Sequence, residues 1–185
     1  LAAREAGIVV AAAAGNDGPN PGTHGNPANA PWVISVAAAT HNRVGAGDRL
    51  AAFSGRGPVV PLGVIKPDVT APGVSIIAAG ITAADSTSTS TLSGTSMATP
   101  HVAGAAALVR SVNPSHGADE VISAIQLTAR NSVTENNLAT NPHQQGAGTV
   151  DVSLAVKAGL YLDVPAGAFN LPRANPYSGG AQNLN

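Results

Sequence analysis

The sequence contains no cysteine and few charged or aromatic residues. Of its 185 residues, 10% are charged and 3% aromatic, and the formal net charge is -1. The absence of cysteine excludes disulfides, thiolate metal sites and cysteine catalysis. A net charge so close to zero gives no electrostatic attraction to nucleic acid or an anionic membrane, so we expect neither as a partner. No apolar run is long enough to span a membrane, because Gly, Pro, Ser or a charge interrupts each one.

The residues that are present form short apolar runs separated by turn formers. Continuous apolar runs at 8–15 and 32–40 are typical of strands buried on both faces of a parallel sheet. A further strand is expected at Val74–Ala78. The segment 16–31 is rich in Gly, Pro and Asn and predicts a loop, and the Ser/Thr-rich segment 85–96 predicts an exposed loop.

Helical patterns follow the predicted strands. They lie at 1–6, 96–110, 115–130 and 150–159. In the segment 115–130, five apolar residues fall on one helical face: Ala118, Val121, Ile122, Ile125 and Ala129. Buried strands followed by helices predict an α/β fold of three layers with a mostly parallel sheet.

A serine stands at the start of the helical pattern in "LSGTSMATPHVAGAAALV", residues 92–109. Small residues before Ser96 permit a tight turn. The helix after it would place free backbone N–H groups and a positive dipole end near the hydroxyl. Ser96 is therefore a candidate nucleophile, but a serine at this place is also a common helix N-cap.

A second polar residue follows the first predicted strand in "AAAAGNDG". Asn16 would lie at the carboxyl ends of the strands, where open α/β sheets bind ligands. Its amide could donate a hydrogen bond into a cleft there. An Asn-Asp-Gly turn explains the same residues without any function.

Together these two segments closely resemble the signatures of the subtilisin-like serine peptidases, or subtilases. "FSGRGP", "KPDVTAPG" and "GAGTVDVSLAV" also look like connecting segments of this family, in the family's order. The resemblance covers residues 1 to about 158 and implies a subtilisin-like α/β fold. It divides the chain into a peptidase part at 1–159 and a tail, or the start of a further segment, at 160–185.

The resemblance also implies roles for single residues. Ser96 would be the nucleophile, and Asn16 and the backbone N–H of Ser96 would stabilise the oxyanion, with Thr95 orienting the site. Three small residues would form the walls of the pocket that binds the substrate side chain before the scissile bond, and a fourth would form the floor of this pocket. The walls are Ala13, Ala14 and Gly15, and the floor is Gly25. Such small walls would admit large apolar side chains of a polypeptide substrate.

The base for Ser96 is not apparent in this sequence. His101 lies five residues further along the same helix, about 500° of rotation away, so we expect a structural role with its ring hydrogen-bonded in the core. The other histidines lie in turn-rich segments and are expected at the surface: His24, His41, His116 and His143. Asp17 and Asp68 are expected to be structural.

In subtilases the acid and the base precede the serine, in the order Asp, His, Ser. Both would fall before Leu1, so the resemblance implies the C-terminal part of a catalytic domain, incomplete at its N-terminus. The missing N-terminal part would be a partner in the site. The chain alone is predicted to be inactive and prone to aggregation, since the sheet would lack its earlier strands.

Two other interpretations stay open. The chain could be an inactive fragment or a non-catalytic binding or structural piece. It could also be an α/β-hydrolase esterase, with Asp119 and His143 completing the site. No metal ligands or cofactor are expected in this chain, although the full-length protein could bind calcium. The resemblance and the lack of cysteine favour an extracellular, secreted bacterial enzyme.

Overall fold

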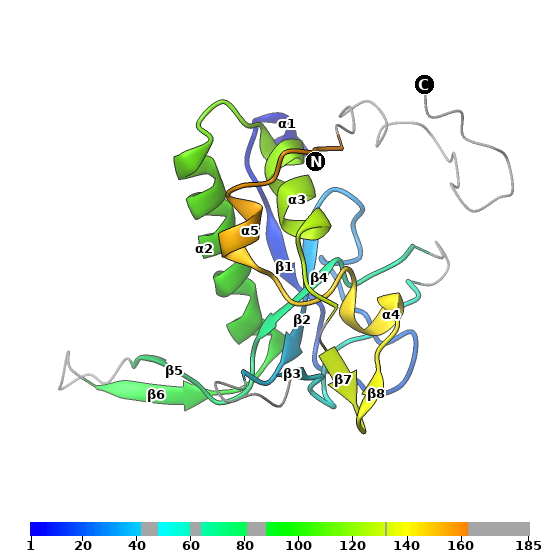
Figure 1. Cartoon of the computed structure of the whole chain (residues 1–185). Helices are drawn as coiled ribbons and strands as arrows, with labels where there is room; N and C mark the ends of the chain where they lie inside the picture. The colour runs from blue at the N-terminus through cyan, green and yellow to red at the C-terminus, as the bar shows by residue number, and fades with distance from the viewer. Residues whose placement is uncertain (42–47, 60–63, 81–87, 132, 163–185) are drawn as a thin grey trace, which may run out of the picture.

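The computed structural model describes residues 1–41, 48–59, 64–80, 88–131 and 133–162. At its centre is a parallel sheet of three strands in the order β1-β2-β4 (Figure 1). The strands are β1 (Ala11–Ala13), β2 (Ile34–Ala39) and β4 (Val69–Pro72). Every residue of β2 is buried, as expected for the middle strand of a parallel sheet. In the register, Ala12 of β1 lies opposite Ser35 of β2.

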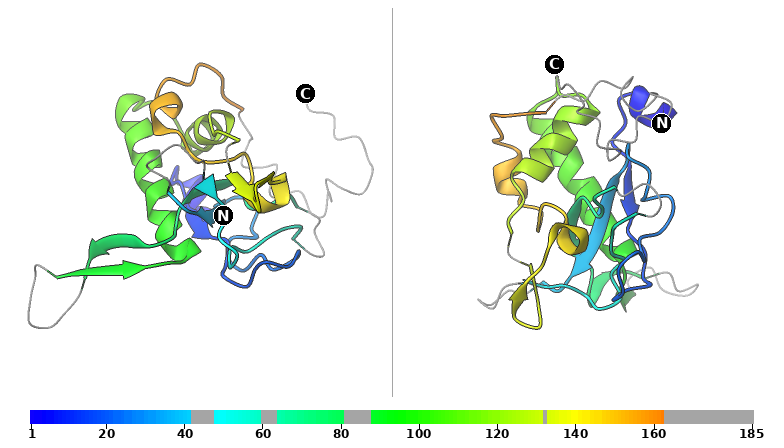
Figure 2. Two further views of the ribbon diagram at one scale, coloured as in Figure 1. Left: turned by 60° about the horizontal axis from the view of Figure 1, so that its bottom comes forward. Right: turned by 90° about the vertical axis from the view of Figure 1, so that its right-hand side faces the viewer.

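The longest helix, α2 (Thr95–Val112), packs against all three strands. Two other helices, α3 (Ala118–Leu127) and α5 (Val152–Ala155), pack against α2 and against each other. In the right-hand view of Figure 2, α3 and α5 lie to the left of β1 and β2, and α2 crosses behind these strands. The main apolar core forms between them and the sheet, where Val36 and Val69 meet Val102 and Ile125.

Loops and a second small sheet cover the opposite face of the central sheet. The second sheet has the order β3-β7-β8 and is followed by the short helix α4. Its elements are β3 (Asp48–Arg49), β7 (Val133–Glu135), β8 (Leu138–Ala139) and α4 (Pro142–Gln145). A small cluster on this side joins Ala37 and Ala39 of β2 to Leu50 and Val133. This layer brings Glu135 and His143 close to Arg56 and Gly57, which follow β3.

An antiparallel hairpin precedes α2 and extends away from the body of the molecule (Figure 1). It consists of β5 (Ile76–Ala79) and β6 (Thr89–Leu92), and Ile77 and Leu92 on it are exposed. At the other end of the chain, α1 (Ala2–Glu5) stops before Gly7, whose φ of +78° is a left-handed conformation that favours glycine.

The α/β class with a mostly parallel sheet is confirmed, and so are the helices expected around 96–110 and 115–130. The strand predicted at Val74–Ala78 is misplaced. The sheet strand is Val69–Pro72, where Thr70 and Pro72 interrupt the apolar signal, and a hairpin strand begins only at Ile76. The prediction of a loop at 85–96 is wrong for Thr89–Leu92, because threonine readily forms strands in an exposed hairpin.

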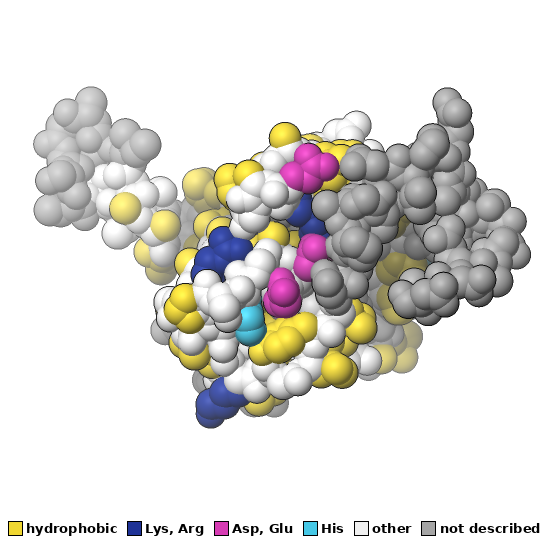
Figure 3. Space-filling view, turned by 90° about the horizontal axis from the view of Figure 1, so that it is seen from above, with side chains coloured by type: hydrophobic (Ala, Val, Ile, Leu, Met, Phe, Trp, Pro, Cys, Tyr) yellow, Lys and Arg dark blue, Asp and Glu magenta, His cyan; other side chains and the backbone are white. Residues whose placement is uncertain are grey.

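The surface seen in Figure 3 carries few charged side chains, and both signs occur on it. This face therefore has no patch of one sign, in keeping with the small net charge. None of the helices within the described ranges has the length and apolar character to cross a membrane. Residues 163–185 lie outside the described part, so the division between 1–159 and 160–185 stays a prediction.

Candidate active site

Ser96 is the second residue of α2, and its side chain is exposed. The N-cap of this helix is Gly94, and no side chain caps it, so the N-cap interpretation of Ser96 is wrong. The Ser96 hydroxyl makes no hydrogen bond to another residue in the described ranges. It is therefore accessible to a reactant at the start of a helix, where backbone N–H groups are free.

Thr95 connects Ser96 to Asn16, which lies 79 positions earlier. The Asn16 Oδ1 accepts hydrogen bonds from the Thr95 N–H and the Thr95 hydroxyl, each at 2.9 Å. The N–H of Gly15 donates to Thr95 Oγ1 at 3.2 Å. Since Thr95 is completely buried, these contacts fix the end of β1 against the start of α2. They hold the amide of Asn16 by its oxygen, so its nitrogen is left to donate.

The two expected oxyanion donors border one small space beside Gly94. The position that a Cβ on Gly94 would take is 3.5 Å from Asn16 Nδ2, 3.5 Å from Met97 Sδ and 3.7 Å from the backbone nitrogen of Ser96. Gly94 has a φ of +159° and no side chain to fill this space. An oxygen atom near this point could accept hydrogen bonds from both nitrogens, which is the arrangement that stabilises an oxyanion.

The four residues expected to form the substrate pocket also lie together. Ala13 ends β1, and Ala14 and Gly15 follow directly. The loop after them returns to the same place, where the Gly25 N–H donates to the Ala14 carbonyl at 2.9 Å. A Cβ on Gly15 would lie 3.4 Å from the nitrogen of Gly25. The structure thus places the expected floor beside the expected walls.

Sequence reasoning missed a third glycine at this pocket, Gly55. Its N–H donates to the Gly15 carbonyl at 2.8 Å. A Cβ at Gly55 would collide with the carbonyl oxygen of Ala14, so only glycine fits there without a shift of the backbone. The signal for it is the segment "FSGRGP", which resembles a connecting segment of the family and contains Gly55.

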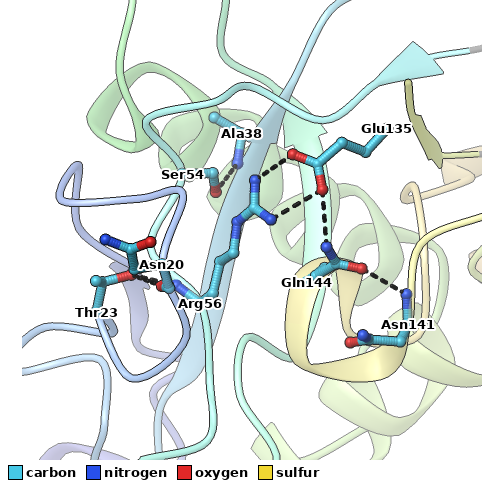
Figure 4. Close-up of polar contacts among 8 residues, drawn as sticks. All are labelled: Asn20, Thr23, Ala38, Ser54, Arg56, Glu135, Asn141 and Gln144. Atoms are coloured by element: carbon cyan, nitrogen blue, oxygen red, sulfur yellow. Dashed lines mark hydrogen bonds and ion pairs between the residues drawn. The ribbon is translucent and has the colours of Figure 1, made fainter.

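Arg56, the next residue, anchors this loop to the second sheet (Figure 4). Its guanidinium makes two hydrogen bonds to the Glu135 carboxylate, at 2.9 and 2.5 Å, and its side chain is almost fully buried. Gln144 of α4 donates to the same carboxylate at 2.9 Å. The hydrogen bonds from Arg56 lower the pKa of Glu135, although partial burial opposes this shift.

The histidines differ in part from what the sequence predicted. His101 is exposed, and its Nδ1 lies 2.9 Å from the Met97 carbonyl of the preceding turn, so the expected place in the core is wrong. His24 is half-buried, with its Nε2 2.6 Å from the Ser35 hydroxyl, and is not a simple surface residue. His41 is exposed as predicted. Within the described residues, no histidine is hydrogen-bonded to Ser96.

Asp68 takes part in a buried ion pair away from Ser96, in keeping with a structural role. The Lys66 ammonium donates to Asp68 at 2.6 Å and to the Val33 carbonyl at 2.8 Å, and the N–H of Ser35 donates to the same carboxylate at 2.6 Å. Burial raises the pKa of the Asp68 carboxyl, and Lys66 opposes this shift.

A family model described as "Subtilase family" matches residues 1–148. The chain belongs to the subtilase family. It is 39% identical to the serine protease AprX of Bacillus subtilis (strain 168) over 163 residues, which are 82% of this chain and 36% of AprX. It is 38% identical over 116 residues to the minor extracellular protease Vpr of the same organism, covering 60% of this chain and 14% of Vpr.

Solved structures of similar fold support the same assignment. Sphericase superposes with a TM-score of 0.68 and 32% identity, over 81% of this subtilase chain and 50% of sphericase. The S41 psychrophilic protease superposes with a TM-score of 0.67 and 30% identity, over 80% of this chain and 49% of the protease. The chain thus spans about half of these structures and about a third of AprX.

The α/β-hydrolase alternative is overturned by the family and by the positions of its residues. The Asp119 carboxylate is paired with Arg4. His143 lies on α4, where its ring is next to Gly57. Neither side chain completes a site with Ser96. Within the described ranges, no group of three or more His, Asp or Glu side chains is placed to hold a metal ion. A calcium site in the full-length protein stays a prediction.

Proposed function

We propose that this subtilase chain carries the nucleophile and the oxyanion donors of a serine endopeptidase. The single observation that carries the proposal is the pair of donors, Asn16 Nδ2 and the Ser96 N–H, around one space next to the exposed Ser96 hydroxyl. This arrangement fits acyl transfer, since the negative oxygen of a tetrahedral intermediate forms beside the attacking serine.

The reaction would proceed in two steps. Ser96 Oγ attacks the carbonyl carbon of the scissile peptide bond and transfers its proton to a base, while the carbonyl oxygen becomes the oxyanion. The C–N bond then breaks, the amine leaves with the proton from the base, and Ser96 holds the acyl group as an ester. Water attacks this ester in the same manner and releases the carboxylic acid and the serine hydroxyl.

We propose that the base and its orienting acid lie in a segment that precedes Leu1. In support, β1 pairs with β2 on one side and with no described strand on the other. Ile8, just before β1, and Leu108 on α2 expose 54% and 53% of their surface. A preceding strand and helix could pair with β1 and cover these apolar side chains.

The substrate would be a polypeptide with a large apolar residue before the scissile bond, because the pocket is bordered by Ala14, Gly15 and Gly25. Secretion is also part of the proposal. Among the relatives, one is named as an extracellular protease and another, from Arabidopsis thaliana, as a CO(2)-response secreted protease. We expect an extracellular enzyme of bacterial origin.

Hydrolysis of a denatured protein substrate tests the proposal. The full-length gene product, which includes whatever precedes Leu1, is compared with its Ser96→Ala variant. Ser111→Ala is the matched control, because Ser111 lies in the last turns of the same helix and its hydroxyl is exposed and bonded to the Leu108 carbonyl. We expect cleavage by the native protein and the control and none by Ser96→Ala.

Cleavage that survives Ser96→Ala would assign the nucleophile elsewhere. A folded full-length product that cleaves no peptide bond would instead favour the non-catalytic interpretation. Residues 1–185 alone should be inactive, because subtilisin that lacks a triad member retains a rate only about 1000- to 10000-fold above that of water.

A further inference from the structure

His24 lies directly before Gly25 in the loop between β1 and β2. Its Nε2 is 2.6 Å from the hydroxyl of Ser35, a completely buried residue of β2. Ser35 lies opposite Ala12 in the register of the parallel sheet. The imidazole therefore ties the returning loop to the middle strand, whose position the whole core fixes.

The backbone N–H groups of His24 and Gly25 hold the loop at two further points. The His24 N–H donates to the Arg56 carbonyl at 3.0 Å, and the Gly25 N–H donates to the Ala14 carbonyl at 2.9 Å. The three contacts fix this stretch in three directions, toward β1, β2 and the 54–57 loop. Only the bond to Ser35 comes from the His24 side chain, so only this one can be removed by substitution without changing the backbone.

We propose that His24, through its contact with Ser35, is a positioning residue that holds Gly25 in place as the floor of the substrate pocket. This inference rests on the proposed function, which makes the space beside Ala14, Gly15 and Gly25 a binding pocket. His24 itself would touch neither the substrate nor Ser96. Loss of the contact would let the floor move and would weaken discrimination between large and small side chains before the scissile bond.

The surroundings of His24 keep its ring neutral at ordinary pH. Burial, and then the positive charge of Lys66, lower the pKa of His24 to about 4, while the backbone of Gly25 acts in the opposite direction. The acidic group near Ser35 is Asp68, whose carboxylate accepts a hydrogen bond from the Ser35 N–H. The charge of this carboxylate is neutralised by Lys66. A neutral ring suits a neutral hydrogen bond with the Ser35 hydroxyl, so the contact persists from mildly acidic pH upward.

The test uses the full-length gene product and two peptide substrates that differ only in phenylalanine or alanine before the scissile bond. His24→Leu and Ser35→Ala each remove the contact. We expect each to lower the ratio of kcat/KM for phenylalanine over alanine by about tenfold, the effect of one lost hydrogen bond, mainly through a higher KM for the phenylalanine substrate. The double variant should lose no more than either single one.

Two further variants separate positioning from a general loss of structure. His24→Gln should restore most of the selectivity, because the glutamine amide can reach Ser35. His116→Leu is the matched control, since His116 is also half-buried but contacts Tyr161, in an edge-on ring contact. It should leave the ratio unchanged.

An unchanged ratio in Ser35→Ala would overturn the inference, and this variant decides the test if His24→Leu does not fold. Equal losses for both substrates in every variant would overturn it as well. Failure of the proposed function has a different signature, because the native full-length protein would then hydrolyse neither substrate.

Discussion

At the scale of single residues, the Thr95 hydroxyl links the two halves of the candidate site. It accepts a hydrogen bond from Gly15 and donates one to Asn16, so a single buried oxygen connects the segment after β1 to the start of α2. Ser96 and Asn16 are candidate site residues that the sequence indicates by their family-like motifs. The linking role of Thr95 is visible only in the structure, because its partners are 79 and 80 positions away.

Thr95→Val should weaken both the structure and the catalysis of the full-length product. It leaves the Gly15 N–H without its acceptor, which costs about 1–3 kcal/mol of unfolding free energy. It also removes one of the two donors that hold Asn16. Urea denaturation and kcat would measure the two effects, and Thr95→Ser should behave nearly as the native protein. A valine variant with native kcat would contradict this linking role.

Asn16→Ala should lower kcat with little change in KM, since the amide would act mainly on the transition state. In subtilisin, removal of the corresponding donor lowers kcat by about 100- to 1000-fold, and we expect the same range here. Asn20→Ala is the control, because Asn20 is an exposed residue of the same loop. Steady-state kinetics decide the matter, and a rise in KM alone would argue against an oxyanion role.

The stability of the full-length product should fall as the pH decreases from about 6.5 to about 4, in part because of His24. In the unfolded chain a histidine has a pKa of about 6.5, whereas burial and Lys66 lower the pKa of His24 in the folded chain to about 4. Between these values the unfolded state binds more protons, so acid favours unfolding. Urea midpoints across this range should fall less steeply for His24→Gln than for the native protein, and identical slopes would contradict the assignment.

At the scale of elements, the loops after β1 and β3 are held by an ion pair with the second sheet, which we call the clamp. Arg56 joins the loop that carries Gly55 to Glu135 of β7, and Gln144 of α4 supports the same carboxylate (Figure 4). The proposed pocket would thus rest on segments that are distant in the sequence, because Gly15 contacts Gly55 and Arg56 contacts Glu135.

Glu135→Ala should destabilise the full-length product by about 2 kcal/mol, because it leaves the buried Arg56 guanidinium without its partner. This value is below that for fully buried pairs, since Glu135 retains 28% exposure and water screens part of the interaction. Glu5→Ala, at an exposed position of α1, should change the stability by less than about 0.5 kcal/mol. Equal effects of the two substitutions on the thermal midpoint would refute the clamp.

The elements differ in how well the sequence predicts them. The helices α2 and α3 and the strand β2 have long apolar patterns, and they appear where expected. The strand β4 contains Thr70 and Pro72, and Thr89–Leu92 has hardly any apolar residue. Neither strand therefore shows the apolar pattern that predicts a strand from sequence. The positions of β7, β8 and α4 follow from contacts such as that of Arg56 with Glu135, which no local pattern reveals.

At the scale of the whole molecule, the chain carries one side of the proposed site, and β1 pairs on one side only within the described residues. It matches the subtilase family over residues 1–148 and spans about half of the solved structures that it resembles. The family could be predicted because the motifs around Asn16 and Ser96 are long and specific, and the roles of these two residues stay predictions. The base could not, because none of the described histidines reaches Ser96.

Labelling with a fluorophosphonate, followed by mass spectrometry to locate the modified residue, tests whether Ser96 is an activated nucleophile whose base lies in a preceding segment. We expect Ser96 to be labelled in the full-length gene product, at a rate that falls with loss of Asn16, and to stay unmodified in residues 1–185 alone. Labelling of the isolated chain at the rate of the full-length product would contradict the claim that the base lies before Leu1. A folded full-length product unlabelled at Ser96 would contradict the assignment of the nucleophile itself.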